Sequence, residues 1–269
     1  MAFEPALQAY GTLYTTYQPW VDTGLLLLSR VLAFMHTAPV FGRKDIPGQM
    51  KTALGVMVCV CMLQAHPELI RQYTALTEVS PTFMVLQIFA NATVGLILGM
   101  MANLAVQTIG ATGNLITNQA GLNMAAMFDP STRSQSMILE PVFLAIATWL
   151  FISIGGMHQL IEALSASIQH IPVFMLQNTL LETLNMDLVV ESINSILPVA
   201  LAMSAPTLVV TLALDVMLGI LNRTAQQIPV FQISNTIKPV LALGILMMSL
   251  PTMMEQMEHI LQEFFRLQP

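Results

Sequence analysis

Charge is scarce in this sequence of 269 residues. Only 9% of the residues are Asp, Glu, Lys or Arg, whereas a typical soluble domain carries about 25%. Because 55% of the residues are hydrophobic, a soluble fold would have to expose much of this apolar material. The formal net charge of −6 argues against nucleic acid as a partner. The composition therefore predicts a helical protein that crosses a membrane several times.

Residues of metal sites and of catalysis are also few. The two cysteines, Cys59 and Cys61, lie two positions apart in an apolar run, so on a helix they point about 200° apart and suit packing. The five histidines are scattered, and no H-E-x-x-H, G-x-S-x-G or P-loop motif occurs. We therefore expect neither enzymatic activity nor a cofactor. An intramembrane hydrolase, in particular, lacks a paired nucleophile and base.

Apolar stretches predict about six helical segments, with kinked or broken helices and a C-terminal helical hairpin, and hence an all-α, polytopic membrane-associated fold. They cover residues 22–39, 51–65, 82–109, 140–157, 189–221 and 239–254. Pro198 and Pro206 should kink or break the fifth segment. The segments contain Arg30, Glu191 and Asp215, charges that are costly in hydrocarbon and should face protein or water. Arg30 and Asp215 could pair with each other.

Basic residues alternate between the connections of these segments. They follow the first, third and fifth segments, and the stretch 158–187, read as a long loop, contains none. The positive-inside rule then places the N-terminus outside and the first, third and fifth connections in the cytoplasm. The fifth connection is accordingly predicted to be a cytoplasmic turn that includes Arg223, Gln226, Phe231 and Lys238.

A polar and small-residue stripe recurs every four residues along the third segment. Its members are Gln87, Asn91, Gly95, Gly99, Asn103 and Gln107. Four residues advance by about 400°, so the stripe winds slowly around a straight helix. The spacing favours close helix–helix contact of the G-x-x-x-G kind, and the alternative is the polar wall of an aqueous cavity. Near the C-terminus, Met254, Met257, Leu261 and Phe264 share one face of an amphipathic helix suited to an interface.

Three stretches together resemble the FliR/SctT family, the R or T component of the type III export gate. The first is "RVLAFMHTAPVFGRKDIPGQMKTALGV", from Arg30, and the second runs from "GNLITNQAG" to Asp129 and Pro130. The third is "APTLVVTLALDVMLGILNRTAQQIPVFQISNTIKPVLALGILMMSLP". The resemblance covers nearly the whole chain. It departs from the family at residues 225–229, where "AQQIP" replaces the usual Pro-Gln-x-Asn run.

The resemblance implies a component of an export gate in the bacterial inner membrane, within the basal body of a flagellum or an injectisome, with the flagellar branch favoured. Its implied partners are the P and Q subunits of the gate, the export-switch protein B, unfolded export substrates and membrane lipid. Residues 1–187 would form a P-like part, and residues 188–269 a Q-like hairpin with an amphipathic tail. A secondary transporter of small solutes with a midplane site is the alternative, although no repeated half is visible.

In that family the middle loop plugs the pore, which corresponds here to residues 113–136. Polar backbone is tolerated at membrane depth only inside protein or beside water. Met124, Met127 and Phe128 at its centre, with Gly121, would form a plug or gasket that blocks ions by dewetting and yields to an unfolded chain. The flanking Gly113 and Gly121 are expected to give the loop freedom to move.

Overall fold

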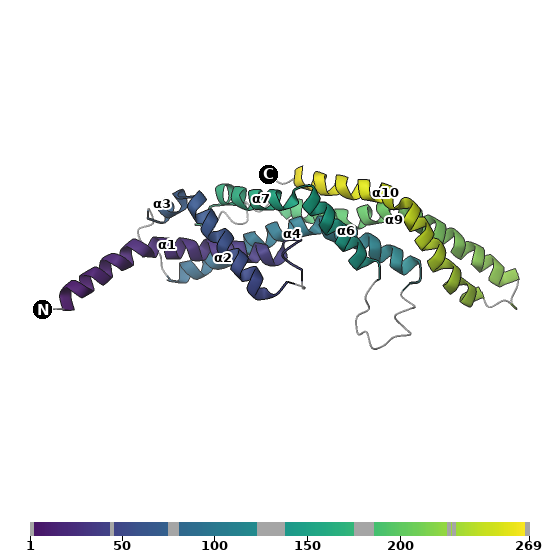
Figure 1. Ribbon diagram of the computed structural model, residues 1–269, viewed down its shortest axis with the longest axis horizontal. Coiled ribbons are helices and arrows are strands. Elements are labelled where there is room, and N and C mark those ends of the chain that lie inside the picture. The colour runs from purple at the N-terminus through teal and green to yellow at the C-terminus, as the bar shows by residue number, and fades with distance from the viewer. Residues whose placement is uncertain are drawn as a thin grey trace. The chain divides into compact units, whose positions relative to one another are not determined.

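The protein is described by a computed structural model in which the described residues are almost entirely helical (Figure 1). The described ranges are 3–43, 46–74, 81–122, 138–174, 186–224, 227 and 230–266. They contain no strand, which confirms the predicted all-α fold. The helices are α1 (Phe3–Thr37), α2 (Gly48–Ala65), α3 (Glu68–Thr74), α4 (Pro81–Gln119), α6 (Glu140–Ser153), α7 (Gly156–His170), α9 (Met186–Thr224) and α10 (Val230–Arg266).

The helices differ from the six predicted segments where hydropathy is a poor guide. The stretch 158–187 was predicted to be a loop, yet α7 occupies its first part, so that prediction is wrong. Leu160, Leu164 and Ile168 are buried at a spacing of four residues, whereas the rest of α7 is largely polar. This helix is amphipathic, and averaging over its two faces hides it from a hydropathy scan.

Proline does not end the long helices. Pro198 and Pro206 lie inside α9, which continues to Thr224, so they do not break the helix. The alternative, a kink at these prolines, stays a prediction. Within the described ranges, four helices are long and apolar enough to cross a membrane, or up to five if the bent pair of α6 and α7 counts as one span. The 39 residues of α4 extend over about 58 Å, nearly twice the roughly 30 Å of a hydrocarbon core.

The chain divides into two compact units, and α4 contributes to both. The first comprises Met1–Asn103 and His158–Asp187. In it α1 packs on α2 and α3. Its core consists of apolar side chains from α1, α4 and α7, among them Leu27, Val31, Phe34, Val94 and Leu164.

The second unit comprises Leu104–Met157 and Leu188–Gln268. Its core takes Ile109 and Ile116 from α4, Phe143 and Phe151 from α6, and Met203 from α9. α10 packs against α6 and buries Met253, Met257 and Leu261. The amphipathic C-terminal helix predicted from the sequence therefore uses at least part of its apolar face within the chain itself.

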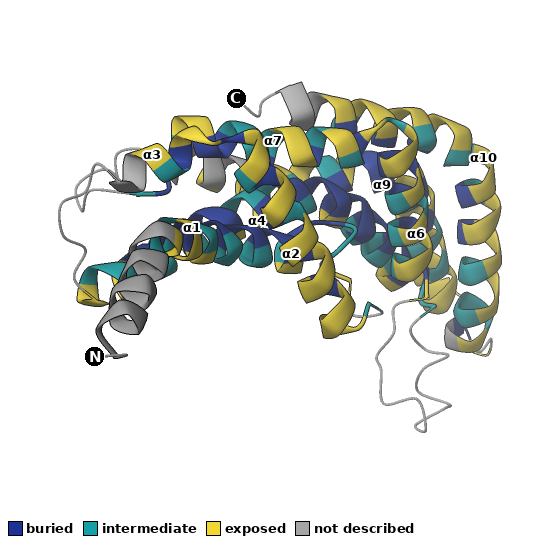
Figure 2. Cartoon of the chain, turned by 60° about the vertical axis from the view of Figure 1, so that its left-hand side comes forward, coloured by how far each residue is buried: buried dark blue, intermediate teal, exposed yellow. Residues whose placement is uncertain are grey.

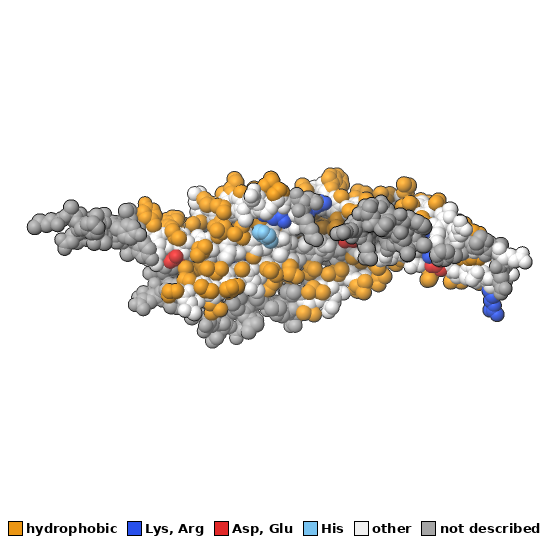
Figure 3. All heavy atoms as spheres, turned by 90° about the horizontal axis from the view of Figure 1, so that it is seen from below, with side chains coloured by type: hydrophobic (Ala, Val, Ile, Leu, Met, Phe, Trp, Pro, Cys, Tyr) orange, Lys and Arg blue, Asp and Glu red, His pale blue; other side chains and the backbone are white. Residues whose placement is uncertain are grey.

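Apolar surface remains exposed on most of the helices (Figure 2). On α9 and α10 the exposed side chains include Val209, Met217, Val240, Met247 and Met248. Hydrophobic side chains are spread over the face drawn in Figure 3, and charged ones on it are few. Such surfaces suit lipid or neighbouring apolar helices rather than water.

Candidate functional site

The base of the 113–136 loop is a well-defined structure in the second unit. α4 does not stop at Ile109 but continues to Gln119, so the first seven residues of the predicted loop are helical. The helix then ends in a Schellman motif, in which the Leu122 amide donates to Thr117 O (3.2 Å) and the Gly121 amide to Asn118 O (3.2 Å). Gly121 has a φ of +71°, a conformation that glycine adopts at little cost.

The far end of the loop returns to the same place. Leu139, which precedes α6, donates its amide to the hydroxyl oxygen of Thr117 (3.3 Å). Gly113 faces this contact, because a Cβ there would lie 2.9 Å from Leu139 O and 3.0 Å from the Phe143 ring. Gly113 therefore lets α4 pack closely on Leu139 and α6. The sequence had instead suggested that this glycine gives the loop freedom to move. Both ends of the loop are thus held together on α4.

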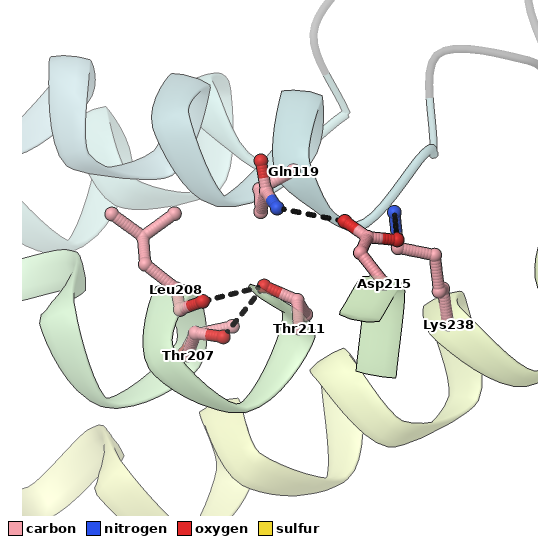
Figure 4. A network of polar contacts seen from close by, with 6 residues as sticks. All are labelled: Gln119, Thr207, Leu208, Thr211, Asp215 and Lys238. Atoms are coloured by element: carbon pink, nitrogen blue, oxygen red, sulfur yellow. Dashed lines mark hydrogen bonds and ion pairs between the residues drawn. The ribbon is translucent and has the colours of Figure 1, made fainter. Parts of the chain in front are cut away.

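A carboxylate ties this base to the C-terminal hairpin (Figure 4). Asp215 on α9 forms an ion pair with Lys238 on α10, at 2.6 Å between Nζ and Oδ1. Its other oxygen, Oδ2, accepts a hydrogen bond from Gln119 Nε2 at the last residue of α4 (3.2 Å). The two oxygens of one side chain therefore connect three helices. Lys238, predicted to lie in a cytoplasmic turn, is in fact inside α10.

A row of hydroxyls leads along α9 to Asp215. Ser204, Thr207 and Thr211 are fully buried on one face of the helix. Ser204 donates to Ala200 O (2.8 Å) and Thr211 to Thr207 O (2.9 Å), one turn earlier. Hydroxyls bonded in this way can be buried at a helix contact without a partner on another helix. Their spacing of three and four residues is visible in the sequence, but neither these hydroxyls nor Gln119 were among the predicted site residues.

Arg30 is fully buried in the first unit and is bonded on all sides. Its Nε donates to Asn91 Oδ1 (3.0 Å), and Nη1 donates to the carbonyls of Ser167 (3.0 Å) and Ile171 (2.9 Å). These carbonyls form the C-terminal end of α7, where a positive charge is favourable. Asp215 has different partners, so the hypothesis that the two charges pair is replaced by a polar site for each.

The four-residue stripe on α4 is a contact surface over its first half. Gln87, Asn91, Gly95 and Gly99 are all buried. A Cβ on Gly95 would overlap the Arg30 carbonyl oxygen, and one on Gly99 would lie 2.8 Å from Phe34 O, so α1 packs closely here. Asn103 is half-buried and Gln107 is exposed. This loss of burial follows from the winding, since each step of four residues turns the stripe by about 40°.

Three hydrogen-bonded side chains in the first unit resemble a hydrolytic triad. His66 lies between Glu68, at 2.9 Å from Nδ1 to Oε1, and Ser165, at 3.0 Å from Nε2 to Oγ. Ser165 thus does have a base beside it, contrary to the sequence-based expectation. However, Ser165 lies inside α7, where the helix uses the backbone amides that would have to stabilise an oxyanion. The pKa of Glu68 is lowered by its own amide and by His66, and the contacts tie α7 to the start of α3.

Other predicted site residues have no described side chain. Met124, Met127, Phe128 and Gln226 lie outside the described residues. The backbones of Glu191 and Phe231 belong to α9 and α10, but their side chains are not described. Arg223 is exposed in the last turn of α9, where its charge suits the helix C-terminus.

Long apolar helices, exposed apolar faces and charges held by polar partners together define a multi-pass helical membrane protein. The sequence matches the model of the family described as "Bacterial export proteins, family 1" over residues 21–264, and the chain belongs to this family. This confirms the resemblance to FliR/SctT proteins. The chain is a membrane component of a type III export apparatus, flagellar or injectisome.

Curated relatives come from both kinds of apparatus. The chain is 27% identical to flagellar biosynthetic protein FliR of Bacillus subtilis over 80% of each chain. It is 25% identical to FliR of Escherichia coli K12 over 92% of each chain. It is also 26% identical to surface presentation of antigens protein SpaR of Salmonella typhimurium over 86% of each chain. The matches cover most of the sequence in all three cases.

Proposed function

We propose that this chain is a pore-forming component of the export gate in the bacterial inner membrane, and that its loop between α4 and α6 closes the channel. The gate passes unfolded substrates of the flagellum. Family membership supports a role in export, and the names of the FliR relatives favour the flagellar branch. The P and Q subunits, the export-switch protein B and lipid are the proposed neighbours of its exposed apolar helices.

The observation that carries the proposed plug is the fixed base of the loop. The Thr117 hydroxyl oxygen accepts a hydrogen bond from the Leu139 amide, and Gly113 lies against the Leu139 carbonyl. A segment that must return to the same closed position after each passage needs a rigid attachment at both ends. The part of the loop beyond Leu122 contains Met124, Met127 and Phe128, whose bulk and apolar character suit a dry constriction. Methionine adapts to surfaces that change, as a passing chain would require.

We further propose that residues 1–187 correspond to a P-like part and residues 188–269 to a Q-like hairpin. The antiparallel pair α9 and α10 supports the second assignment, because it is a helical hairpin joined by a short connection. One boundary between the two compact units also falls directly after Asp187, as the proposed division does. Residues Leu104–Met157, however, belong to the same unit as the hairpin. Copurification of the chain with two smaller membrane proteins would support the assignment, and isolation as a homo-oligomer would favour a transporter.

The plug is tested by replacing Met124, Met127 and Phe128 together with Ala. Assembly should be unchanged, because the described helices and the base of the loop are untouched. Small-ion leakage should rise, since a wider and less apolar constriction wets more readily. The measurement is the membrane conductance, or the salt sensitivity, of cells that produce the complete gate. The matched control is Met247→Ala with Met248→Ala, two strongly exposed methionines on α10.

The same conductance for the triple variant and the parent, in correctly assembled complexes, would place the constriction in another subunit. The loop would then be a structural connector. Loss of assembly in the triple variant would likewise contradict the proposal, because a plug should not carry subunit contacts. Increased leakage from the α10 control would show that the effect comes from methionine loss in general.

A further inference from the structure

We propose that Asp215 and Lys238 are positioning residues that hold the end of α4, and with it the start of the loop, on the α9–α10 hairpin. This inference rests on the proposed function, because it assigns a role to the attachment of the same loop. It adds that the hairpin holds the last turn of α4, where the loop starts, through the carboxylate of a single ion pair.

The geometry concentrates the link in one carboxylate. Asp215 Oδ1 lies 2.6 Å from Lys238 Nζ, and Oδ2 accepts from Gln119 Nε2 at 3.2 Å. Gln119 is the last residue of α4, two positions before the glycine that turns the chain into the loop. Figure 4 shows the Gln119 and Lys238 side chains reaching Asp215 from different helices. Movement of α10 relative to α9 would therefore act directly on the end of α4.

The surroundings make this pair stronger than an ordinary surface ion pair. The side chains of Lys238 and Asp215 are 17% and 38% exposed, so both are partly withdrawn from solvent. Their neighbours on α9, Leu212 and Val216, are apolar and exposed, and suit cover by lipid or by another subunit. Under such cover, removing one charge leaves the other without a partner in a medium of low polarity. The carboxylate would then lose its fixed orientation toward Gln119.

The two ends of the loop are held differently. The Leu139 end is fixed by a backbone amide on Thr117 within α4 and α6. The Gln119 end is tied to the hairpin by a side-chain contact that depends on charge. A charge-dependent tie can be lost without unfolding the helices, so a change in the hairpin can loosen the last turn of α4 while the contact between Leu139 and Thr117 stays in place.

The test compares four variants of the chain in the purified gate complex with the parent. Asp215→Asn and Lys238→Met each remove one charge, and Asp215→Lys with Lys238→Asp restores the pair in reverse. In the reversed pair the Gln119 amide has to turn, so that its Oε1 accepts from the ammonium at position 215. Glu258→Gln is the control, because Glu258 lies on the exposed surface of α10, where it accepts a hydrogen bond from Gln262 Nε2. Hydrogen exchange is followed in peptides covering residues 113–122. Membrane conductance is measured on the same variants.

Each single variant should raise exchange at 113–122 by about tenfold, because losing the tie favours local opening at the end of the helix. The reversed pair should return to within about threefold of the parent, and Glu258→Gln should change nothing. Asp215→Asn preserves shape, so it decides the question if Lys238→Met does not assemble. Unchanged exchange in an assembled single variant, or a reversed pair worse than both singles, would overturn the inference.

The conductance separates this inference from the proposed function. Exchange and leakage that rise together in the single variants support both. Increased exchange without leakage supports the tie, and if the replacement of Met124, Met127 and Phe128 also causes no leakage, the plug is refuted. If the Met124, Met127 and Phe128 replacements cause leakage but the single charge variants leave exchange unchanged, the plug stands and the tie is refuted.

Discussion

Replacement of Arg30 by Met is expected to destabilise the first unit severely. Arg30 is fully buried, and it satisfies Asn91 Oδ1 and the carbonyls of Ser167 and Ile171. Methionine fills much of the same space but donates no hydrogen bond. Each buried acceptor left unpaired costs about 1–3 kcal/mol. Part of this sum is offset, because the variant no longer has to remove a charged guanidinium from water. A net loss of about 3–5 kcal/mol is expected, as for breaking other buried charged networks.

The loss can be measured as a shift in thermal midpoint. The monodisperse fraction in detergent is followed by size-exclusion chromatography after heating at one fixed rate, because unfolding of such proteins is commonly irreversible. With about 2–4 °C per kcal/mol for a chain of this size, the midpoint should fall by at least about 6 °C. Arg30→Lys should be intermediate, since an ammonium keeps the charge but not the planar fork of donors.

Arg223→Met is the matched control, because Arg223 is exposed in the last turn of α9. It should change stability by less than about 0.5 kcal/mol. If Arg30→Met unfolded within about 2 °C of the parent, Asn91 Oδ1 and the carbonyls of Ser167 and Ile171 would have to find other donors at little cost. The reasoning that makes this arginine the tie between α1, α4 and α7 would then be wrong.

Two further predictions concern glycines. Gly95→Leu with Gly99→Leu should prevent α1 from packing on α4, because a side chain at either position meets the backbone of α1. In native gels the double variant should therefore run as aggregates. Gly219→Leu is the control and should migrate like the parent, because a Cβ there meets nothing within 4 Å. Normal migration of the double variant would refute the close contact. Gly121→Ala should lower the thermal midpoint by the equivalent of about 1 kcal/mol, because it forces a Cβ into a φ of +71° without creating a clash. An unchanged midpoint would show that α4 does not need this turn.

The sequence predicted helices best where an apolar stretch and a helix cover the same residues. α2, predicted over residues 51–65, begins only three residues earlier, and the family assignment held over most of the chain. The prediction failed at residues 113–119, which are polar and were assigned to the loop. Asn114, Thr117 and Asn118 sit in a helix there because their side chains bond within it, as in the bond from Asn118 Nδ2 to Asn114 Oδ1 (2.7 Å). Hydropathy cannot detect a helix whose polar groups satisfy one another.

For the charges in apolar segments, the sequence predicted that polar partners exist but not which residues they are. An isolated charge in an apolar segment requires polar partners, and both Arg30 and Asp215 have them. Arg30, however, is bonded mainly by backbone carbonyls at the end of α7, a helix that the sequence did not reveal. A carbonyl belongs to every residue and leaves no trace in composition or spacing. Such partners can be located only once the path of the chain is known.

Arg30 also imposes an order on biosynthesis. The carbonyl of Ser167 is 137 residues further along the chain, and that of Ile171 is 141 residues away. At a synthesis rate of about 5–20 residues per second, the ribosome takes roughly 7–27 s to make the segment that receives the guanidinium. During that interval the guanidinium needs water or another polar group as its partner. The core of the first unit can therefore be completed only after α7 has been made.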